Sequence, residues 1–179
     1  MKPIEQHLTQ YAAYHRDRRN IATHFVGIPM IVFSVILALE TLGFSIAGWT
    51  VSAAAMLAVI SSIYYLRLDW ALGIAMSVVL FFMCAGASEI EPRLGPPATL
   101  WLAAALFIVG WALQFLGHKY EGMKPAFYDD MMQLAIGPLF ICAEAFFMAG
   151  AKPQLRRYVE ERVGPVVARR EHAAGSATR

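Results

Sequence analysis

Three long stretches of this sequence contain no charged residue, and they constrain its fold more than any other feature. They run over residues 44–66, 70–88 and 98–116. Each approaches or exceeds the ~18–20 apolar residues that a helix needs to cross a bilayer. A helix on the surface of a soluble bundle would instead place polar residues on its outer face every three or four positions. The chain is therefore predicted to be an integral membrane protein.

Two weaker apolar stretches flank these three. Residues 20–39 carry His24 as their one ionisable side chain, and residues 131–151 carry Glu144. The composition agrees, because 58% of the residues are hydrophobic and 16% are charged, against roughly 25% charged in soluble domains. We therefore expect an all-α, integral membrane helical bundle with about five hydrophobic helices.

Basic residues gather at both ends of the chain, before residue 20 and from Lys152 onward. Positive residues that flank membrane spans favour the cytoplasm, so both ends are expected there. Two cytoplasmic ends require an even number of crossings, and one of the five segments should not cross. We expect the last one to be broken or re-entrant, since Gly137-Pro138 interrupts it and such segments are tolerated where they line a cavity. Residues 117–130 then return to the N-terminal side.

The membrane domain is predicted to span residues 1–155, and a basic tail over residues 156–179 should form a short surface helix followed by disorder. The N-terminal segment is polar and resembles no cleavable signal peptide. Cys84 and Cys142 lie inside apolar stretches without metal-type spacing, which indicates buried structural thiols. Asp129 and Asp130 precede the last apolar stretch and are expected to cap its helix.

Three of the five histidines, His15, His24 and His118, lie where predicted spans meet the polar zone. On one straight helix, His15 and His24 would point to opposite sides, because nine residues amount to two and a half turns at about 3.6 residues per turn. They can converge only if the chain breaks between them. Asn20 suits the N-cap of a helix that begins after such a break.

His118 ends the fourth apolar stretch, and Gln114, His118 and Glu121 share one helical face at positions i, i+4 and i+7. Three imidazoles on one side of a membrane bundle suggest a divalent metal site. Histidines with one carboxylate and open positions suit non-haem Fe(II) and oxygen chemistry. Asn20 and Gln114 could hold the second ring nitrogens in the required tautomer.

Each of these residues also has an ordinary structural interpretation, which stays open. A histidine at a membrane interface can simply be an amphipathic residue at headgroup level, and His7 and His172 are assigned that role. Glu144 could serve a metal, proton or substrate path, or be a hydrogen-bonded structural group. Lys124 could pair with a substrate carboxylate or headgroup, or be a plain interfacial lysine.

The histidines belong to two longer motifs, Tyr14-His15-x4-Asn20-x3-His24-x4-Pro29 and Gly110-Trp111-x2-Gln114-Phe115-x-Gly117-His118. The second motif is followed by Glu121, Pro125-Ala126, Pro138-x-Phe140 and Glu144. In these residues the chain resembles the Mpo1-like family. The resemblance runs from about residue 7 to residue 155. The two histidine motifs, in this order and at this spacing in a small hydrophobic chain, are fairly specific.

The resemblance implies a dioxygenase that depends on ferrous iron, Fe(2+), and uses O2 to shorten 2-hydroxy long-chain fatty acids by one carbon. It implies that His15, His24 and His118 are the metal ligands. Glu121 and Lys124 become the candidate catalytic residues, with Lys124 meeting the substrate carboxylate at the rim. A eukaryotic relative would work in the endoplasmic reticulum, and a bacterial one in the inner membrane with its site facing the cytoplasm.

Two other functions remain compatible with the residues. A small transporter could use Glu144 and the broken last segment as its path, and a non-catalytic lipid-binding membrane protein would tolerate substitution of all three histidines. A di-iron hydroxylase is disfavoured, because membrane hydroxylases of that kind need more histidines than the five present. The sequence has no phosphate-binding glycine loop, serine-nucleophile elbow or nucleic-acid signature.

Overall fold

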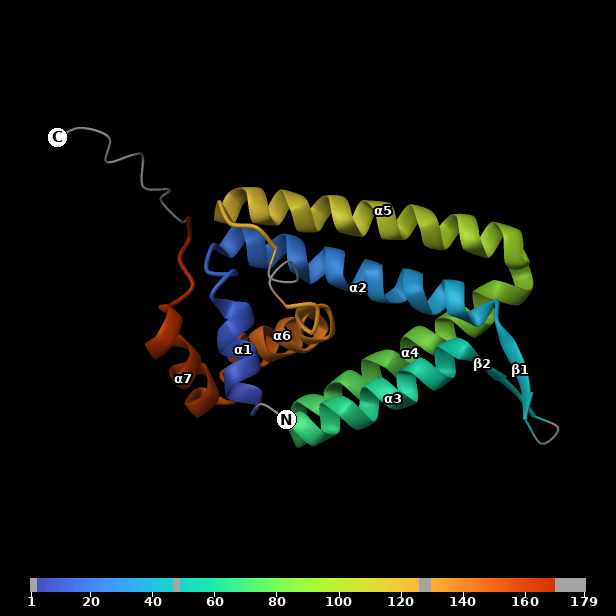
Figure 1. Ribbon diagram of the computed structural model, residues 1–179, viewed down its shortest axis with the longest axis horizontal. Coiled ribbons are helices and arrows are strands. Elements are labelled where there is room, and N and C mark those ends of the chain that lie inside the picture. The colour runs from blue at the N-terminus through green and yellow to red at the C-terminus, as the bar shows by residue number, and fades with distance from the viewer. Residues whose placement is uncertain (1–2, 47–48, 126–129, 170–179) are drawn as a thin grey trace.

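The computed structural model describes residues 3–46, 49–125 and 130–169, and this part of the chain is almost entirely helical (Figure 1). Its helices are α1 (Ile4–Ala12), α2 (Arg18–Glu40), α3 (Ala53–Leu68), α4 (Trp70–Leu94), α5 (Pro96–Glu121), α6 (Gln133–Met148) and α7 (Pro153–Val163). Strands β1 (Gly43–Ile46) and β2 (Trp49–Ser52) form a small antiparallel hairpin, with Gly43 opposite Ser52. The all-α prediction is confirmed.

Three helices, α2, α4 and α5, are long and apolar enough to cross a membrane. Helix α3 is also apolar, but its 16 residues span only about 24 Å at 1.5 Å per residue. The charge-free stretch that begins at Phe44 thus supplies the hairpin first and a helix only from Ala53. Hydrophobicity alone could not separate the two, since a short apolar run fits a strand or a helix equally well.

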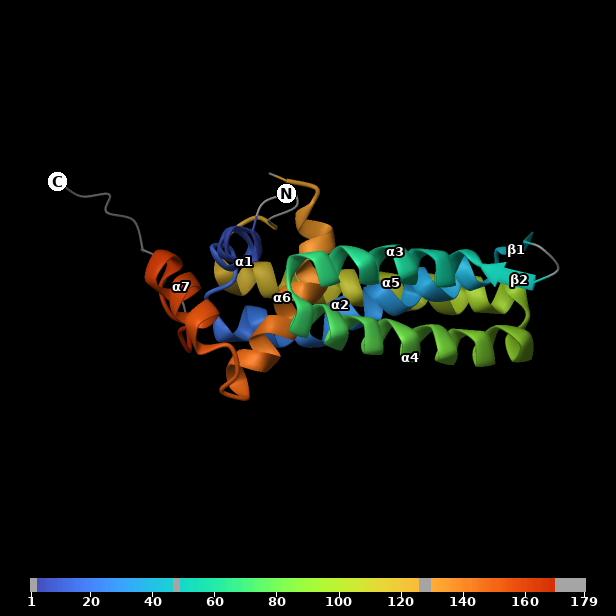
Figure 2. The same cartoon turned by 90° about the horizontal axis from the view of Figure 1, so that it is seen from below.

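Helices α2 and α5 pack side by side, and α3 pairs with α4 (Figures 1 and 2). Glycines allow the first pair to approach closely: a Cβ atom on Gly27 would lie 2.9 Å from the carbonyl oxygen of Gly110, and a Cβ atom on Gly110 would lie 2.9 Å from that of Gly27. Small residues at such contacts let helix backbones touch in membrane bundles.

Helices α1, α6 and α7 gather at one end of the bundle, and the β1–β2 hairpin lies at the other (Figure 1). The start of α2 and the end of α5 lie at the same end as α1. The end of α5 thus returns to the end of the bundle where α2 begins. His24 in α2 and His118 in α5 therefore come to the same end of the bundle.

The last apolar segment is broken, but at a different place from the one predicted. Helix α6 continues through Gly137 and Pro138, and the chain bends by 112° between α6 and α7. The interruption predicted at Gly137-Pro138 is therefore wrong, because a helix can tolerate the one hydrogen bond that proline removes. The bend follows from Gly150 and Lys152, whose φ angles of 75° and 55° are left-handed and end a helix.

The chain after the bend packs back onto α1. Leu155 and Val159 of α7 are buried in the same cluster as Ile4 and Leu8 of α1. Residues 164–169 then reach the loop between α1 and α2. Asp129 and the predicted disordered end, residues 170–179 with His172, lie outside the described residues, whereas Cys84 and Cys142 are half-buried free thiols.

Candidate metal centre

The chain breaks between His15 and His24, as their convergence requires. Helix α1 ends at Ala12 and α2 begins at Arg18. The N-cap of α2 is Asp17, whose carboxylate accepts a hydrogen bond of 2.9 Å from the backbone N–H of Arg19. The prediction that Asn20 caps this helix is wrong, since Asn20 lies inside the first turn. The loop over residues 13–17 turns the ring of His15 back toward α2.

The rings of His15, His24 and His118 converge at this end of the bundle. One nitrogen from each ring lies within 4.8 Å of those of the other two. The ring centroids are 4.5 Å apart for His15 and His24, 4.9 Å for His15 and His118, and 5.1 Å for His24 and His118. Their exposed fractions are 0%, 1% and 6%. Within the described part of the chain, this is the group with the spacing of metal ligands.

Backbone carbonyls fix the tautomers of two of these rings. His15 Nδ1 lies 2.7 Å from the Tyr11 carbonyl oxygen, and His24 Nδ1 lies 2.9 Å from the Asn20 carbonyl oxygen. A carbonyl can only accept, so each Nδ1 carries the hydrogen and each neutral ring keeps a lone pair on Nε2. Burial, together with the nearby His24 and His118, holds the pKa of His15 well below its usual value and keeps that ring neutral.

The two Nε2 atoms of His15 and His24 face each other at 3.0 Å. Two lone pairs at this distance repel, unless an electron-pair acceptor lies between them. Two imidazole nitrogens that bind one ion at about 2.1 Å and about 90° to each other would be about 3.0 Å apart. The observed spacing would suit two ligands of one ion, and the donor set fits a divalent metal ion.

Glu121 contacts the loop that carries His15 and is outside the group of three rings. Its carboxylate accepts the backbone N–H of Arg16, 3.0 Å from each oxygen, and that of Asp17 at 2.8 Å. It also accepts a hydrogen bond of 3.1 Å from the side-chain amide of Asn20. The two backbone N–H groups belong to the residues just before α2, so Glu121 ties the end of α5 to the loop between α1 and α2.

Arg16 and Glu144 form a buried ion pair beside the same loop, with Nη2 and Oε1 3.4 Å apart. Arg16 also donates from Nε to the carbonyls of Ala12 and His15, at 2.9 and 2.8 Å, and from Nη1 to that of Gly164 at 3.0 Å. Glu144 lines a cavity different from the one beside the histidines. The Arg16 guanidinium is thus the structural partner of the Glu144 carboxylate.

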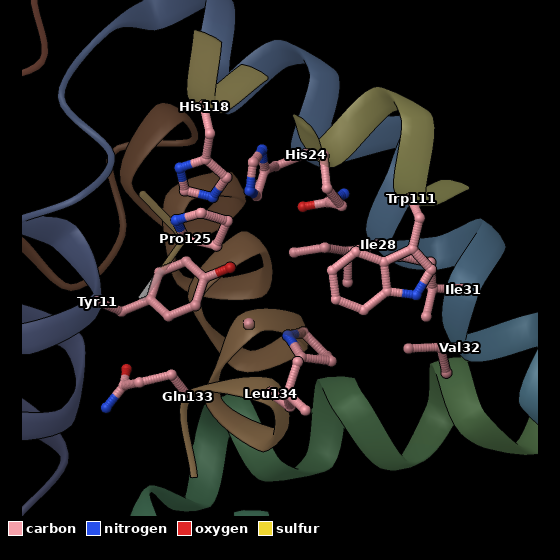
Figure 3. A pocket seen from close by; sticks show the side chains of 13 residues that line it. Tyr11, His24, Ile28, Ile31, Val32, Trp111, His118, Pro125, Gln133 and Leu134 are labelled. Atoms are coloured by element: carbon pink, nitrogen blue, oxygen red, sulfur yellow. The ribbon is translucent and has the colours of Figure 1, made fainter. Parts of the chain in front are cut away.

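A cavity of about 80 Å³ adjoins the histidines between α2, α5 and α6 (Figure 3). His24 and His118 form part of its wall. Its other lining residues are mostly apolar, with three polar side chains among them: Ile28, Ile31, Val32, Trp111, Pro125, Leu134, Gly137 and Pro138, and the polar Tyr11, Gln114 and Gln133. Figure 3 shows Tyr11 near His118, and Trp111, Ile31 and Val32 on the opposite side.

The predicted partners of the ring nitrogens differ in part from those in the structure. Asn20 holds His24 through its backbone carbonyl, while its side-chain amide donates to the Tyr14 carbonyl at 3.1 Å and to Glu121. Gln114 lines the cavity, and its amide nitrogen lies against Gly27 without a hydrogen-bond partner among the described residues.

Lys124 is exposed and follows α5, next to the cavity residue Pro125, but it does not line the cavity itself. His7 is buried on α1 outside the three-histidine group. Sequence reasoning missed Tyr11, whose ring stacks on that of His15 with centroids 4.2 Å apart and planes 6° apart. Tyr11 lies four residues before His15, and at this spacing a backbone carbonyl can reach the histidine ring. That spacing was the signal in the sequence.

Comparison with known proteins gives two matches. The chain matches the family described as 2-hydroxy-palmitic acid dioxygenase Mpo1-like over residues 1–149. It is 30% identical over 159 residues to the 2-hydroxy-palmitic acid dioxygenase MPO1 of Saccharomyces cerevisiae, which covers 88% of this chain and 87% of the yeast protein. No solved structure matches. The chain therefore belongs to the Mpo1-like family.

Proposed function

We propose that this protein is an Fe(II)-dependent dioxygenase that shortens 2-hydroxy fatty acids by one carbon at the end of a membrane bundle. The observation that carries the proposal is the pair of Nε2 lone pairs of His15 and His24, which face each other at 3.0 Å beside His118. The yeast relative is named a dioxygenase of 2-hydroxy-palmitic acid. Family and geometry thus support the same chemistry.

His15, His24 and His118 would hold the ion through one ring nitrogen each. Three protein ligands would leave other positions on the ion open, as non-haem iron oxygenases require. Bound iron supplies the one-electron chemistry that O2 requires. The residues around it keep the ligands ready: the carbonyls of Tyr11 and Asn20 hold the hydrogens of the two rings on Nδ1, and Glu121 fixes the loop that carries His15.

The cavity supports a fatty acid as the substrate. Two of its polar side chains lie beside the histidines, since Tyr11 stacks on His15 and Gln114 comes one turn before His118. Apolar side chains such as Ile28, Ile31 and Trp111 complete its wall. A volume of about 80 Å³ accommodates the acid head but not a whole long acyl chain. The rest of the chain would lie along the apolar surfaces of the helices, so the substrate is expected to enter from the bilayer.

The test is anaerobic purification, elemental analysis and incubation with 2-hydroxypalmitate and O2, followed by mass spectrometry of the products. We expect bound iron and a fatty acid one carbon shorter. His24→Ala and His118→Ala should each remove both, because each deletes one of three ligands to the same ion. His7→Gln is the matched control, since His7 is also buried but lies outside the site. Turnover retained in either alanine variant would refute the ligand role of that histidine.

The two alternative functions have less support. A transporter would use Glu144 in an open path, but this carboxylate lies 3.4 Å from the Arg16 guanidinium and is only 8% exposed. A non-catalytic lipid-binding protein would bind no iron and would tolerate the loss of His24 or His118. The same elemental analysis therefore separates the enzyme from both alternatives.

A further inference from the structure

Tyr11 supplies a hydroxyl group to the wall of the cavity beside the histidines. The residue belongs to α1, which packs against the end of the bundle, and its side chain is 7% exposed. In Figure 3 its ring lies near His118 with the hydroxyl oxygen turned into the cavity. Tyr11 thus brings an O–H donor to the wall of the cavity that His24 and His118 also line.

The position of this hydroxyl is fixed by packing. The ring stacks on His15 and lies 4.7 Å, between centroids, from that of Phe140. Gly137 of α6 leaves room for the hydroxyl, because a Cβ atom there would stand 3.0 Å from its oxygen. A larger residue at position 137 would crowd the hydroxyl.

No hydrogen bond joins this hydroxyl to a described residue, and its oxygen is not among the fully enclosed polar atoms that lack a partner, so it is open to the cavity. Native structures nearly always give a hydroxyl in such a place a hydrogen-bond partner, which can be a molecule in the cavity. The oxygen faces the cavity, so a ligand in the cavity can satisfy it. The hydroxyl is therefore available to an acceptor atom of a molecule that binds in the cavity.

We propose that the Tyr11 hydroxyl donates a hydrogen bond to the carboxylate of the fatty acid substrate and so orients the acid head against the histidines. The inference rests on the proposed function. A phenol is protonated near neutral pH and can donate. A hydrogen bond to an ionised carboxylate is roughly twice as strong as one between neutral groups.

Other groups are less suited to this role. Lys124, which the sequence analysis proposed as the partner of the substrate carboxylate, does not line the cavity. The amide nitrogen of Gln114 lies against Gly27. His24 keeps its Nδ1 hydrogen on the Asn20 carbonyl. The ring of Tyr11 is held by its stacking on His15, so its hydroxyl offers a donor at a fixed place in this space.

The variant Tyr11→Phe tests the proposal, because it removes the hydroxyl and keeps the ring, the stacking on His15 and the backbone carbonyl. Binding of 2-hydroxypalmitate is measured on the zinc-loaded protein, which needs no turnover, and KM and kcat on the iron-loaded protein. We expect binding about tenfold to a hundredfold weaker, since a hydrogen bond to a charged group is lost. KM should rise by a similar factor, and metal content should stay unchanged.

Tyr65→Phe is the matched control. Tyr65 is also buried, but its hydroxyl donates to the Ala135 carbonyl at 2.9 Å and it does not line the cavity. We expect its substrate affinity to equal that of the wild type. Gly137→Ala is the second variant, which keeps the tyrosine and crowds its hydroxyl, and it should weaken binding in the same direction.

The outcomes are distinct. Substrate affinity within twofold of the wild type in Tyr11→Phe overturns the inference and leaves the proposed function intact. Loss of metal together with substrate also overturns it, because Tyr11 would then act through His15. If the wild-type protein binds metal but neither binds nor converts 2-hydroxypalmitate, the proposed function fails and the inference fails with it.

Discussion

Tyr11 and Asn20 each place a carbonyl oxygen four residues before a histidine, and each oxygen accepts the Nδ1 hydrogen of that ring. The same local arrangement therefore occurs once at the end of α1 and once at the start of α2. Hydrogen bonds of this kind fix the orientation and tautomer of metal-binding histidines. Tyr11 and Asn20 thus orient two of the proposed ligands through their backbone carbonyls, whatever side chains they carry.

Glu121 gives the first prediction at this scale. Glu121→Gln should weaken metal binding about tenfold to a hundredfold, the usual effect of losing a partner that orients a ligand. The neutral amide accepts the N–H groups of Arg16 and Asp17 less well than the carboxylate does, so the loop that carries His15 loosens. Competition with a chelator measures the metal dissociation constant.

Glu89→Gln is the control for this variant, because Glu89 is an exposed carboxylate paired with Arg93 on the surface of α4. Its metal affinity should equal that of the wild type. An unchanged dissociation constant in Glu121→Gln would show that the carboxylate does not support the site.

The sequence predicted which histidines meet, but not what supports them. Their positions at the ends of apolar stretches bring His24 and His118 to one end of the bundle. The bond from Arg16 to Glu121 joins residues 105 positions apart, and no local pattern contains that information. The Asn20 cap was mispredicted for the same reason, because the choice of Asp17 depends on where the chain leaves α1.

At the scale of elements, the segment after α7 closes onto the loop between α1 and α2. The Val167 N–H donates to the Arg16 carbonyl at 2.8 Å, and the Arg18 N–H donates to the Val167 carbonyl at 2.9 Å. The family match ends at residue 149, so Val167 lies beyond it while Arg16 and Arg18 lie within it. The end of the chain thereby stabilises the loop that carries His15.

A chain that ends at Pro165 should test this support. It retains α7 and the Gly164 carbonyl but loses both bonds to Val167, and we expect it to be less stable by about 1–3 kcal/mol at about 1 kcal/mol per hydrogen bond. Thermal unfolding in detergent measures the difference. A chain that ends at Arg169 is the control, since it retains the pairing, and equal melting temperatures for the two chains would contradict the prediction.

For the molecule as a whole, the charge-free stretches were sufficient to predict a helical membrane bundle. They could not show that Phe44 lies in a strand or that the last segment bends after α6. Those features depend on turn residues such as Gly150 and Lys152, and on packing against α1. Hydrophobicity reports what is buried or faces lipid, and local backbone geometry then decides where each helix ends.

The whole bundle carries one further prediction, which concerns its orientation. The site and α7 lie at the same end, and we expect that end to face the cytoplasm because basic residues flank it. In a bacterial chain the membrane would be the inner membrane. A cysteine-reactive reagent that cannot cross membranes should fail to label a cysteine introduced at Ser176 in intact cells, after Cys84 and Cys142 are replaced by alanine. Labelling of that position from outside would contradict this orientation.

The close contact of Gly27 with Gly110 has a consequence for metal choice. The two glycines lie on the helices that carry His24 and His118, and their backbones touch without intervening side chains. The packing of the helices therefore fixes the distance between the backbone segments that carry these two rings. If the rings hold an ion as proposed, a cation of unsuitable radius would meet stretched or compressed bonds, and the bundle would contribute to discrimination by size.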